Sequence, residues 1–143
     1  MAYFSYKYFT LACVLLASSA CSQNDGQKLH SVNIFNLLAV PENYLGDRVV
    51  VPGFLAENGG AYYLVGGKDW IDYAAPSTGV AIEVKRDKKT LKSMSACVGS
   101  YVQVIAQFKV SKMTHRYALM YLESVSADMP EHNEIRPCIE IKS

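Results

Sequence analysis

The feature that most restricts the fold is a ten-residue stretch, Tyr101–Val110, in which apolar and other side chains alternate. Successive side chains of a β-strand point to opposite faces, so this pattern predicts a strand with one buried face. Ile105 is the apolar exception on the outer face. The residues expected on the buried face are Val102, Val104, Ala106, Phe108 and Val110.

Four further strands and two helices are expected around this strand. Asn58-Gly59-Gly60 predicts a tight hairpin, because Asn and Gly accept positive φ at low cost. Helices are expected at 31–40 and 87–96, and strands at 49–55, 61–65, 79–85 and 117–125. The order is that of a five-stranded OB-like antiparallel barrel, with one helix before strand 1 and one between strands 3 and 4. We therefore expect an all-β fold with minor α, and an SH3-like small barrel is the alternative.

The first twenty residues have the features of an export signal. The apolar run 11–17 is too short to cross a bilayer, and small residues precede Cys21. This arrangement resembles the bacterial lipobox, in which the cysteine receives a lipid and becomes the first residue after cleavage. Ordinary secretion after Ala20 is the alternative. Residues 1–20 are thus expected to be a lipoprotein signal peptide, and the polar residues 21–30 a flexible tether.

Two further motifs are typical of strand and turn geometry. They are Tyr44-Leu45-Gly46-Asp47-Arg48-Val49-Val50-Val51-Pro52-Gly53-Phe54-Leu55 and Val98-Gly99-Ser100-Tyr101-Val102-Gln103-Val104. In these segments the chain resembles small, uncharacterised bacterial OB-fold lipoproteins. The resemblance implies a barrel domain at 31–126, followed by a C-terminal tail at 127–143. It also implies a protein of the bacterial cell envelope, and Ser22 after the lipidated cysteine favours the outer membrane.

The cysteines outside the signal peptide and the lipidation site are Cys97 and Cys138. In an oxidising compartment an even pair predicts a disulfide. The bond would attach the C-terminal tail to the barrel. Two separate thiols are the alternative.

Positive charge is concentrated in the middle of the chain. Between residues 80 and 117 eight basic side chains face only Glu83 and Asp87, and we expect the patch to bind an anionic partner outside the cytoplasm. The two basic segments need not be adjacent in a barrel. Nucleic acid is not expected, since an exported protein meets little of it. The basic residues are Lys85, Arg86, Lys88, Lys89, Lys92, Lys109, Lys112 and Arg116.

Catalytic and metal-binding residues are not expected. His30, His115 and His132 do not have the spacing of metal ligands, and Asp69 with Asp72 is more typical of a solvated loop than of an acid–base pair. We therefore expect no enzyme activity, no catalytic residue, no metal and no cofactor.

Two functions follow from these features. The first is a non-enzymatic envelope lipoprotein whose barrel binds a protein or an anionic glycan, with the membrane as a further partner through the N-terminal lipid. The second is an inhibitor or immunity-type lipoprotein that blocks an envelope enzyme or toxin through the loop 66–78. Trp70 and Tyr73 would be the anchors of that loop, because large aromatic side chains dominate many interfaces.

Overall fold

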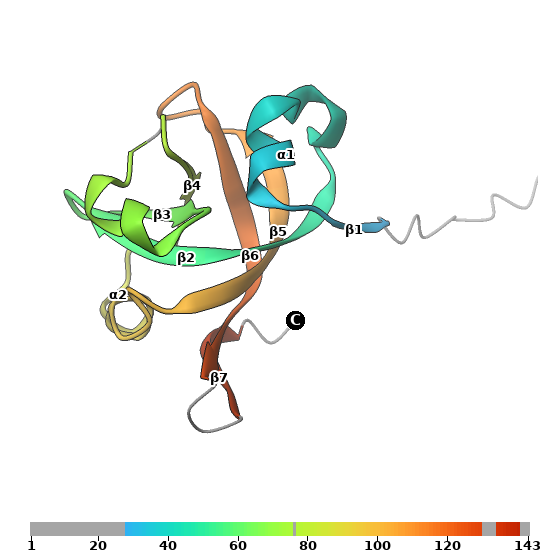
Figure 1. The fold of residues 1–143 in the computed structure, drawn as a ribbon. Helices are drawn as coiled ribbons and strands as arrows, with labels where there is room; N and C mark the ends of the chain where they lie inside the picture. The colour runs from blue at the N-terminus through green and yellow to red at the C-terminus, as the bar shows by residue number, and fades with distance from the viewer. Residues whose placement is uncertain (1–27, 76, 130–133, 141–143) are drawn as a thin grey trace, which may run out of the picture.

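A computed structural model describes residues 28–75, 77–129 and 134–140 (Figure 1). The expectations for the signal peptide, for Cys21 and for most of the tether lie outside these residues. Five strands form the body of the molecule: β2 (Arg48–Asn58), β3 (Ala61–Val65), β4 (Gly79–Ile82), β5 (Tyr101–Val110) and β6 (Tyr117–Met129). In the described part of the chain no helix has the length and apolar character to span a membrane.

The five strands close into a ring, compatible with a small barrel. β2, β3 and β4 form an antiparallel meander, β4 pairs in parallel with the start of β6, and β6 pairs antiparallel with β5. β2 is long enough to pair with β3 through its second half and with β5 through its first half, which closes the ring. The mostly-β class is confirmed.

Pro52-Gly53 lies where β2 passes from one partner to the other. Phe54 pairs with both Val65 of β3 and Tyr101 of β5. A Cβ atom on Gly53 would lie 2.8 Å from Cγ of Leu64 and 2.9 Å from the carbonyl oxygen of Val65. Only a residue without a side chain allows the two strands to approach this closely.

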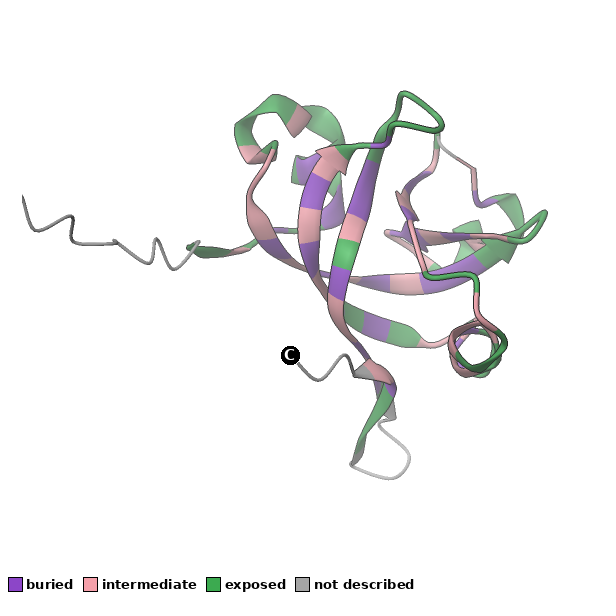
Figure 2. Cartoon of the chain, turned by 180° about the vertical axis from the view of Figure 1, so that it is seen from behind, coloured by how far each residue is buried: buried purple, intermediate pink, exposed green. Residues whose placement is uncertain are grey.

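The core fills the interior of the ring, and buried residues alternate with more exposed ones along the strands (Figure 2). Val102, Val104, Ala106 and Phe108 of β5 are almost fully buried, as the alternation predicts. Val110 is 43% exposed, so its predicted burial is wrong. The reason is its position at the end of β5, where the chain leaves the sheet and enters the β5–β6 hairpin.

Both predicted helices exist, but the first begins later than expected. α1 is Ile34–Ala39, and Asn33 caps it by accepting a hydrogen bond from the Asn36 backbone N–H at 2.8 Å. Ser31 instead ends a short strand, β1 (Leu29–Ser31), which pairs in parallel with β2, so the expected tether ends before Leu29. A 3-10 helix, η1 (Pro41–Tyr44), follows α1.

The second helix, α2 (Lys88–Ser95), agrees closely with its prediction. Asp87 caps its first turn, because one carboxylate oxygen accepts from the Thr90 backbone N–H and the other from the Thr90 hydroxyl, both at 2.9 Å. These hydrogen bonds lower the pKa of Asp87 below its usual range. Tyr62 attaches the helix to the barrel, since its hydroxyl lies 2.9 Å from the Ser95 hydroxyl.

The C-terminal segment is more ordered than the expected tail. β7 (Glu134–Glu140) pairs antiparallel with the second half of β6, which runs beyond the expected end of the last strand. The predicted disulfide is confirmed: Cys97 and Cys138 are bonded at 2.07 Å across a separation of 41 residues. The bond joins the segment after α2 to β7.

Candidate functional site

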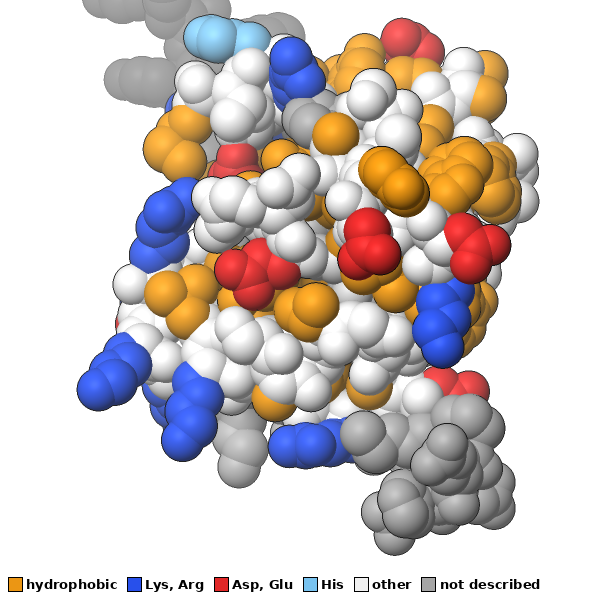
Figure 3. All heavy atoms as spheres, turned by 60° about the vertical axis from the view of Figure 1, so that its left-hand side comes forward, with side chains coloured by type: hydrophobic (Ala, Val, Ile, Leu, Met, Phe, Trp, Pro, Cys, Tyr) orange, Lys and Arg blue, Asp and Glu red, His pale blue; other side chains and the backbone are white. Residues whose placement is uncertain are grey.

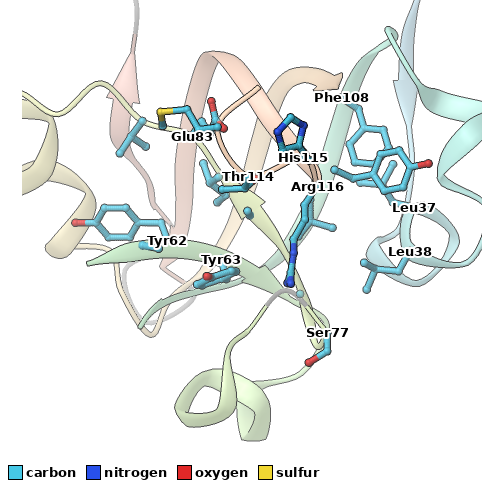
Figure 4. A pocket seen from close by; sticks show the side chains of 18 of the residues that line it. Leu37, Leu38, Tyr62, Tyr63, Ser77, Glu83, Phe108, Thr114, His115 and Arg116 are labelled. Carbon is cyan, nitrogen blue, oxygen red and sulfur yellow. The ribbon is translucent and has the colours of Figure 1, made fainter. Parts of the chain in front are cut away.

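Two of the clefts that the described residues form are lined from different parts of the barrel. The first cleft, of about 600 Å³, lies over β3 and β4, between α1 and the β5–β6 hairpin (Figure 4). The second cleft, of about 610 Å³, lies between the start of α2, β6 and β7. Glu83, which follows β4, lines both.

The β5–β6 hairpin shapes one wall of the first cleft. Ser111 is fully buried, and its hydroxyl accepts hydrogen bonds from the backbone N–H groups of Met113 and Thr114. His115 then adopts a φ of +54°, a conformation that His accepts more readily than most residues. Arg116 follows and extends into the opening of the cleft, with Tyr63 on one side and Leu38 on the other (Figure 4).

An aromatic pair lines part of the first cleft. The rings of Phe108 and Tyr117 stack with centroids 5.5 Å apart. The Tyr117 hydroxyl donates to a carboxylate oxygen of Glu42 in η1 at 3.2 Å. Partial burial raises the pKa of Tyr117, and the neighbouring Glu42 carboxylate adds to the effect. This contact joins the segment after α1 to the start of β6.

The second cleft has a different composition. Its floor is apolar, formed in part by Leu122 and Ile139, and its rim carries Lys85, Lys89 and the exposed Tyr121. Cys138 of the disulfide also lines it. The disulfide therefore fixes one wall of this cleft.

The structure divides the predicted basic patch instead of uniting it. Arg86 and Arg116 line the first cleft, and Lys85 and Lys89 line the second. The ammonium group of Lys109 lies 4.7 Å from the ring centre of Tyr121, which brings it toward the second cleft. Figure 3 shows Lys and Arg side chains spread along the edges of one face, without a continuous basic surface. Lys88, Lys92 and Lys112 are exposed and line neither cleft.

The loop 66–78 is folded onto the barrel. It contains a 3-10 helix, η2 (Lys68–Tyr73), and the Asn58 side chain donates to the Ala74 carbonyl at 2.9 Å. The ring of Trp70 packs edge-to-face on Phe35 of α1, with centroids 6.2 Å apart. Trp70 remains 43% exposed in this position. Tyr73 is 74% exposed, and neither aromatic residue lines a cleft.

The residues weighed for chemistry come from separate elements, except that Asp69 and Asp72 both lie in η2. His30 pairs with Asp47 at 3.6 Å, while His115 lies on the β5–β6 hairpin; His132 is outside the described residues. Within the described part of the chain no group of three or more His, Cys, Asp or Glu side chains could hold a metal ion. Cys97 is in the disulfide and is not a free nucleophile.

Comparison with known proteins found no matching family model, no matching curated protein and no matching solved structure. The site is therefore interpreted from its own residues. Sequence reasoning did not single out Tyr121 as a site residue. Its position inside an apparently regular strand, 117–125, gives no sign that the chain bulges there.

Proposed function

We propose that this protein is a non-enzymatic binding module that holds an anionic glycan in the first cleft. The observation that carries the proposal is the combination of an aromatic and apolar wall with two arginines among the residues that line the cleft. Aromatic side chains such as Tyr63 offer a flat face to a sugar ring. The guanidinium groups of Arg86 and Arg116 offer paired donors that suit a planar carboxylate.

The position of the cleft supports the same proposal if the barrel is of the OB type. The ring order β2-β3-β4-β6-β5 and the helix between β4 and β5 agree with a five-stranded OB barrel better than with an SH3-like one. OB barrels bind oligosaccharides and oligonucleotides on the face of strands 2 and 3, flanked by loops 1–2 and 4–5. The corresponding parts here are β3, β4, the β2–β3 turn and the β5–β6 hairpin, all of which line the first cleft.

We also propose that the module is anchored in the bacterial envelope through a lipid on Cys21, in the outer membrane. The support is the sequence of residues 1–20, which resembles an export signal, the lipobox-like residues before Cys21, and Ser22, which favours the outer membrane by the same resemblance. Replacement of Cys21 by Ser should move the protein from the membrane fraction to the soluble fraction. A wild-type protein found wholly in the soluble fraction would contradict the anchor.

The test of ligand binding uses the chain from residue 21 onward, with Cys21 changed to Ser. Titration calorimetry would compare tetragalacturonate with a neutral glucose tetrasaccharide of the same length. We expect the acidic sugar to bind and the neutral one to bind at least tenfold more weakly, which corresponds to about 1.4 kcal/mol. Arg116→Gln should remove most of this preference. Lys112→Gln is the matched control, because it removes a charge from the same hairpin outside the cleft.

Equal binding of the two sugars would contradict a carboxylate site. Loss of binding in Lys112→Gln to the same extent as in Arg116→Gln would show that only overall charge matters, and it would also contradict the proposal.

A further inference from the structure

Tyr121 has a backbone conformation that a bulky residue rarely adopts. Its φ is +49°, although it lies within a strand. This left-handed conformation costs free energy for residues other than Gly, Asn and Asp, and it persists only where the surrounding structure imposes it. Tyr121 is 65% exposed, so core packing is not the reason for its presence.

The conformation arises from a bulge in β6. Met120 pairs with Gln107 and Ser124 pairs with Ile105, so Tyr121, Leu122 and Glu123 stand opposite the single residue Ala106. The three bulged side chains have different environments. Leu122 is buried in the core, and Glu123 forms an ion pair with Arg48. Tyr121 and Leu122 both line the second cleft, Leu122 in its apolar floor and Tyr121 as the exposed member of the three.

The charges around Tyr121 favour an anion. Lys85 and Lys89 line the cleft, and Lys109 lies over the Tyr121 ring. The carboxylates in the cleft are Glu83 and Asp87. Both oxygens of Asp87 already accept hydrogen bonds from Thr90. Asp87 caps the helix, so Glu83 supplies the one remaining carboxylate. The ammonium groups of Lys85, Lys89 and Lys109 therefore outnumber it by three to one.

The two clefts also differ in the kind of cation they present. The first cleft carries arginines, whose planar donors pair bidentately with carboxylate or phosphate, whereas the second carries lysines, compact point charges that bind a phosphate without requiring a planar, two-pronged geometry. The second cleft adds the Tyr121 ring and the hydroxyl of Ser93. An aromatic face beside hydroxyl groups suits a sugar.

We propose that the second cleft is a binding site for a phosphorylated sugar, with the phosphate held by Lys85 and Lys89 and the sugar ring stacked on Tyr121. The bulge in β6 directs this ring into the second cleft. The site does not depend on the proposed function of the first cleft, because the two clefts share only Glu83.

The test measures binding of glucose 1-phosphate, glucose and inorganic phosphate to the chain from residue 21 onward with Cys21→Ser. Vesicles that carry lipid A form a fourth arm, which distinguishes a phosphorylated glycolipid head group from a free sugar phosphate. We expect glucose 1-phosphate or lipid A to bind more tightly than either glucose or phosphate alone. Tightest binding to inorganic phosphate would overturn the proposal in favour of a simple anion site.

The decisive variant is Tyr121→Asn, because Asn accepts positive φ more readily than Tyr. We expect it to bind the sugar phosphate roughly three- to tenfold more weakly, while its melting temperature stays the same or rises. Weaker binding together with a lower melting temperature would mean that the ring has a structural role and would overturn the proposal. Unchanged binding would overturn it as well.

Two further variants separate this site from the first cleft. The pair Lys85→Gln and Lys89→Gln should abolish binding of the sugar phosphate, whereas Lys88→Gln, an exposed neighbour outside both clefts, should not. Arg116→Gln should leave it intact. Loss of sugar phosphate binding in Arg116→Gln would place the ligand in the first cleft and overturn the proposal.

Discussion

The two clefts have nearly equal volumes, yet the chain builds them by different means. The first lies over regular strands and is lined mainly by α1, β3, β4 and the β5–β6 hairpin. The second depends on a bulge in β6 and on β7, which the disulfide attaches to the segment after α2. Two consecutive residues line different clefts, since Lys85 lines the second cleft and Arg86 lines the first. A short segment between a strand and a helix can therefore supply cations to two separate sites.

Each cleft also includes one residue other than Gly with a positive φ. His115 lines the first cleft and Tyr121 lines the second. His115 lies in a hairpin, where such a conformation is common for a residue of its kind. Tyr121 lies in a strand and is bulky, so its conformation points more strongly to a function.

Removal of the disulfide should have the largest effect on stability. It should also affect ligand binding differently in the two clefts. We expect the double variant Cys97→Ala, Cys138→Ala to lose about 4 kcal/mol of unfolding free energy in the chain-entropy model, because the bond closes a loop of about 40 residues. Urea unfolding measures this loss. Sugar phosphate binding in the second cleft should fall with it, while ligand binding in the first cleft should persist below the unfolding transition. Loss of both bindings in the folded variant would mean that the clefts are not independent.

The first cleft should be sensitive to a side chain at Gly79. A Cβ atom there would lie 2.6 Å from the Leu64 carbonyl oxygen and 2.8 Å from Cγ1 of Val65. Gly79→Ala should therefore push β4 away from β3 and cost about 1 to 3 kcal/mol. Gly67→Ala is the control, because a Cβ atom there meets nothing within 4 Å. If Gly79→Ala weakened binding in the second cleft as much as in the first, the comparison between the clefts would fail.

The smallest effect should come from the ion pair between Arg48 and Glu123, which is more than one-third exposed. The hydrogen bond from Arg48 holds the pKa of Glu123 below its usual value. The folded protein thus gains stability above the unfolded pKa of about 4.3 and loses it as the pH falls through the lower folded value. Wild type should exceed Glu123→Gln in melting temperature by a small margin at pH 6.

This difference should disappear at acid pH and shrink in high salt. A wild-type advantage that persists at acid pH would contradict the ion-pair explanation. Glu123 shares the β6 bulge with Tyr121, so any change in ligand binding should be confined to the second cleft.

Much of the fold follows from local patterns. The alternation in β5, the Gly59-Gly60 turn and the Asp87 cap could be predicted because each depends on residues close in sequence. The disulfide could be predicted from the number of cysteines and the expected compartment, without knowledge of the geometry. The late start of α1 was missed because Ser31 and Asn33 are both good caps, and the choice depends on the pairing of β1 with β2.

The sequence by itself determined which residues alternate, turn and cap, and it determined that cations are concentrated between residues 80 and 117. Only the tertiary structure decided how these cations are divided, where Tyr121 points, and that the C-terminal segment forms a strand on β6. The physical reason is that these features depend on register between strands far apart in sequence. A bulge changes which side chains face outward without leaving a local pattern that would predict it.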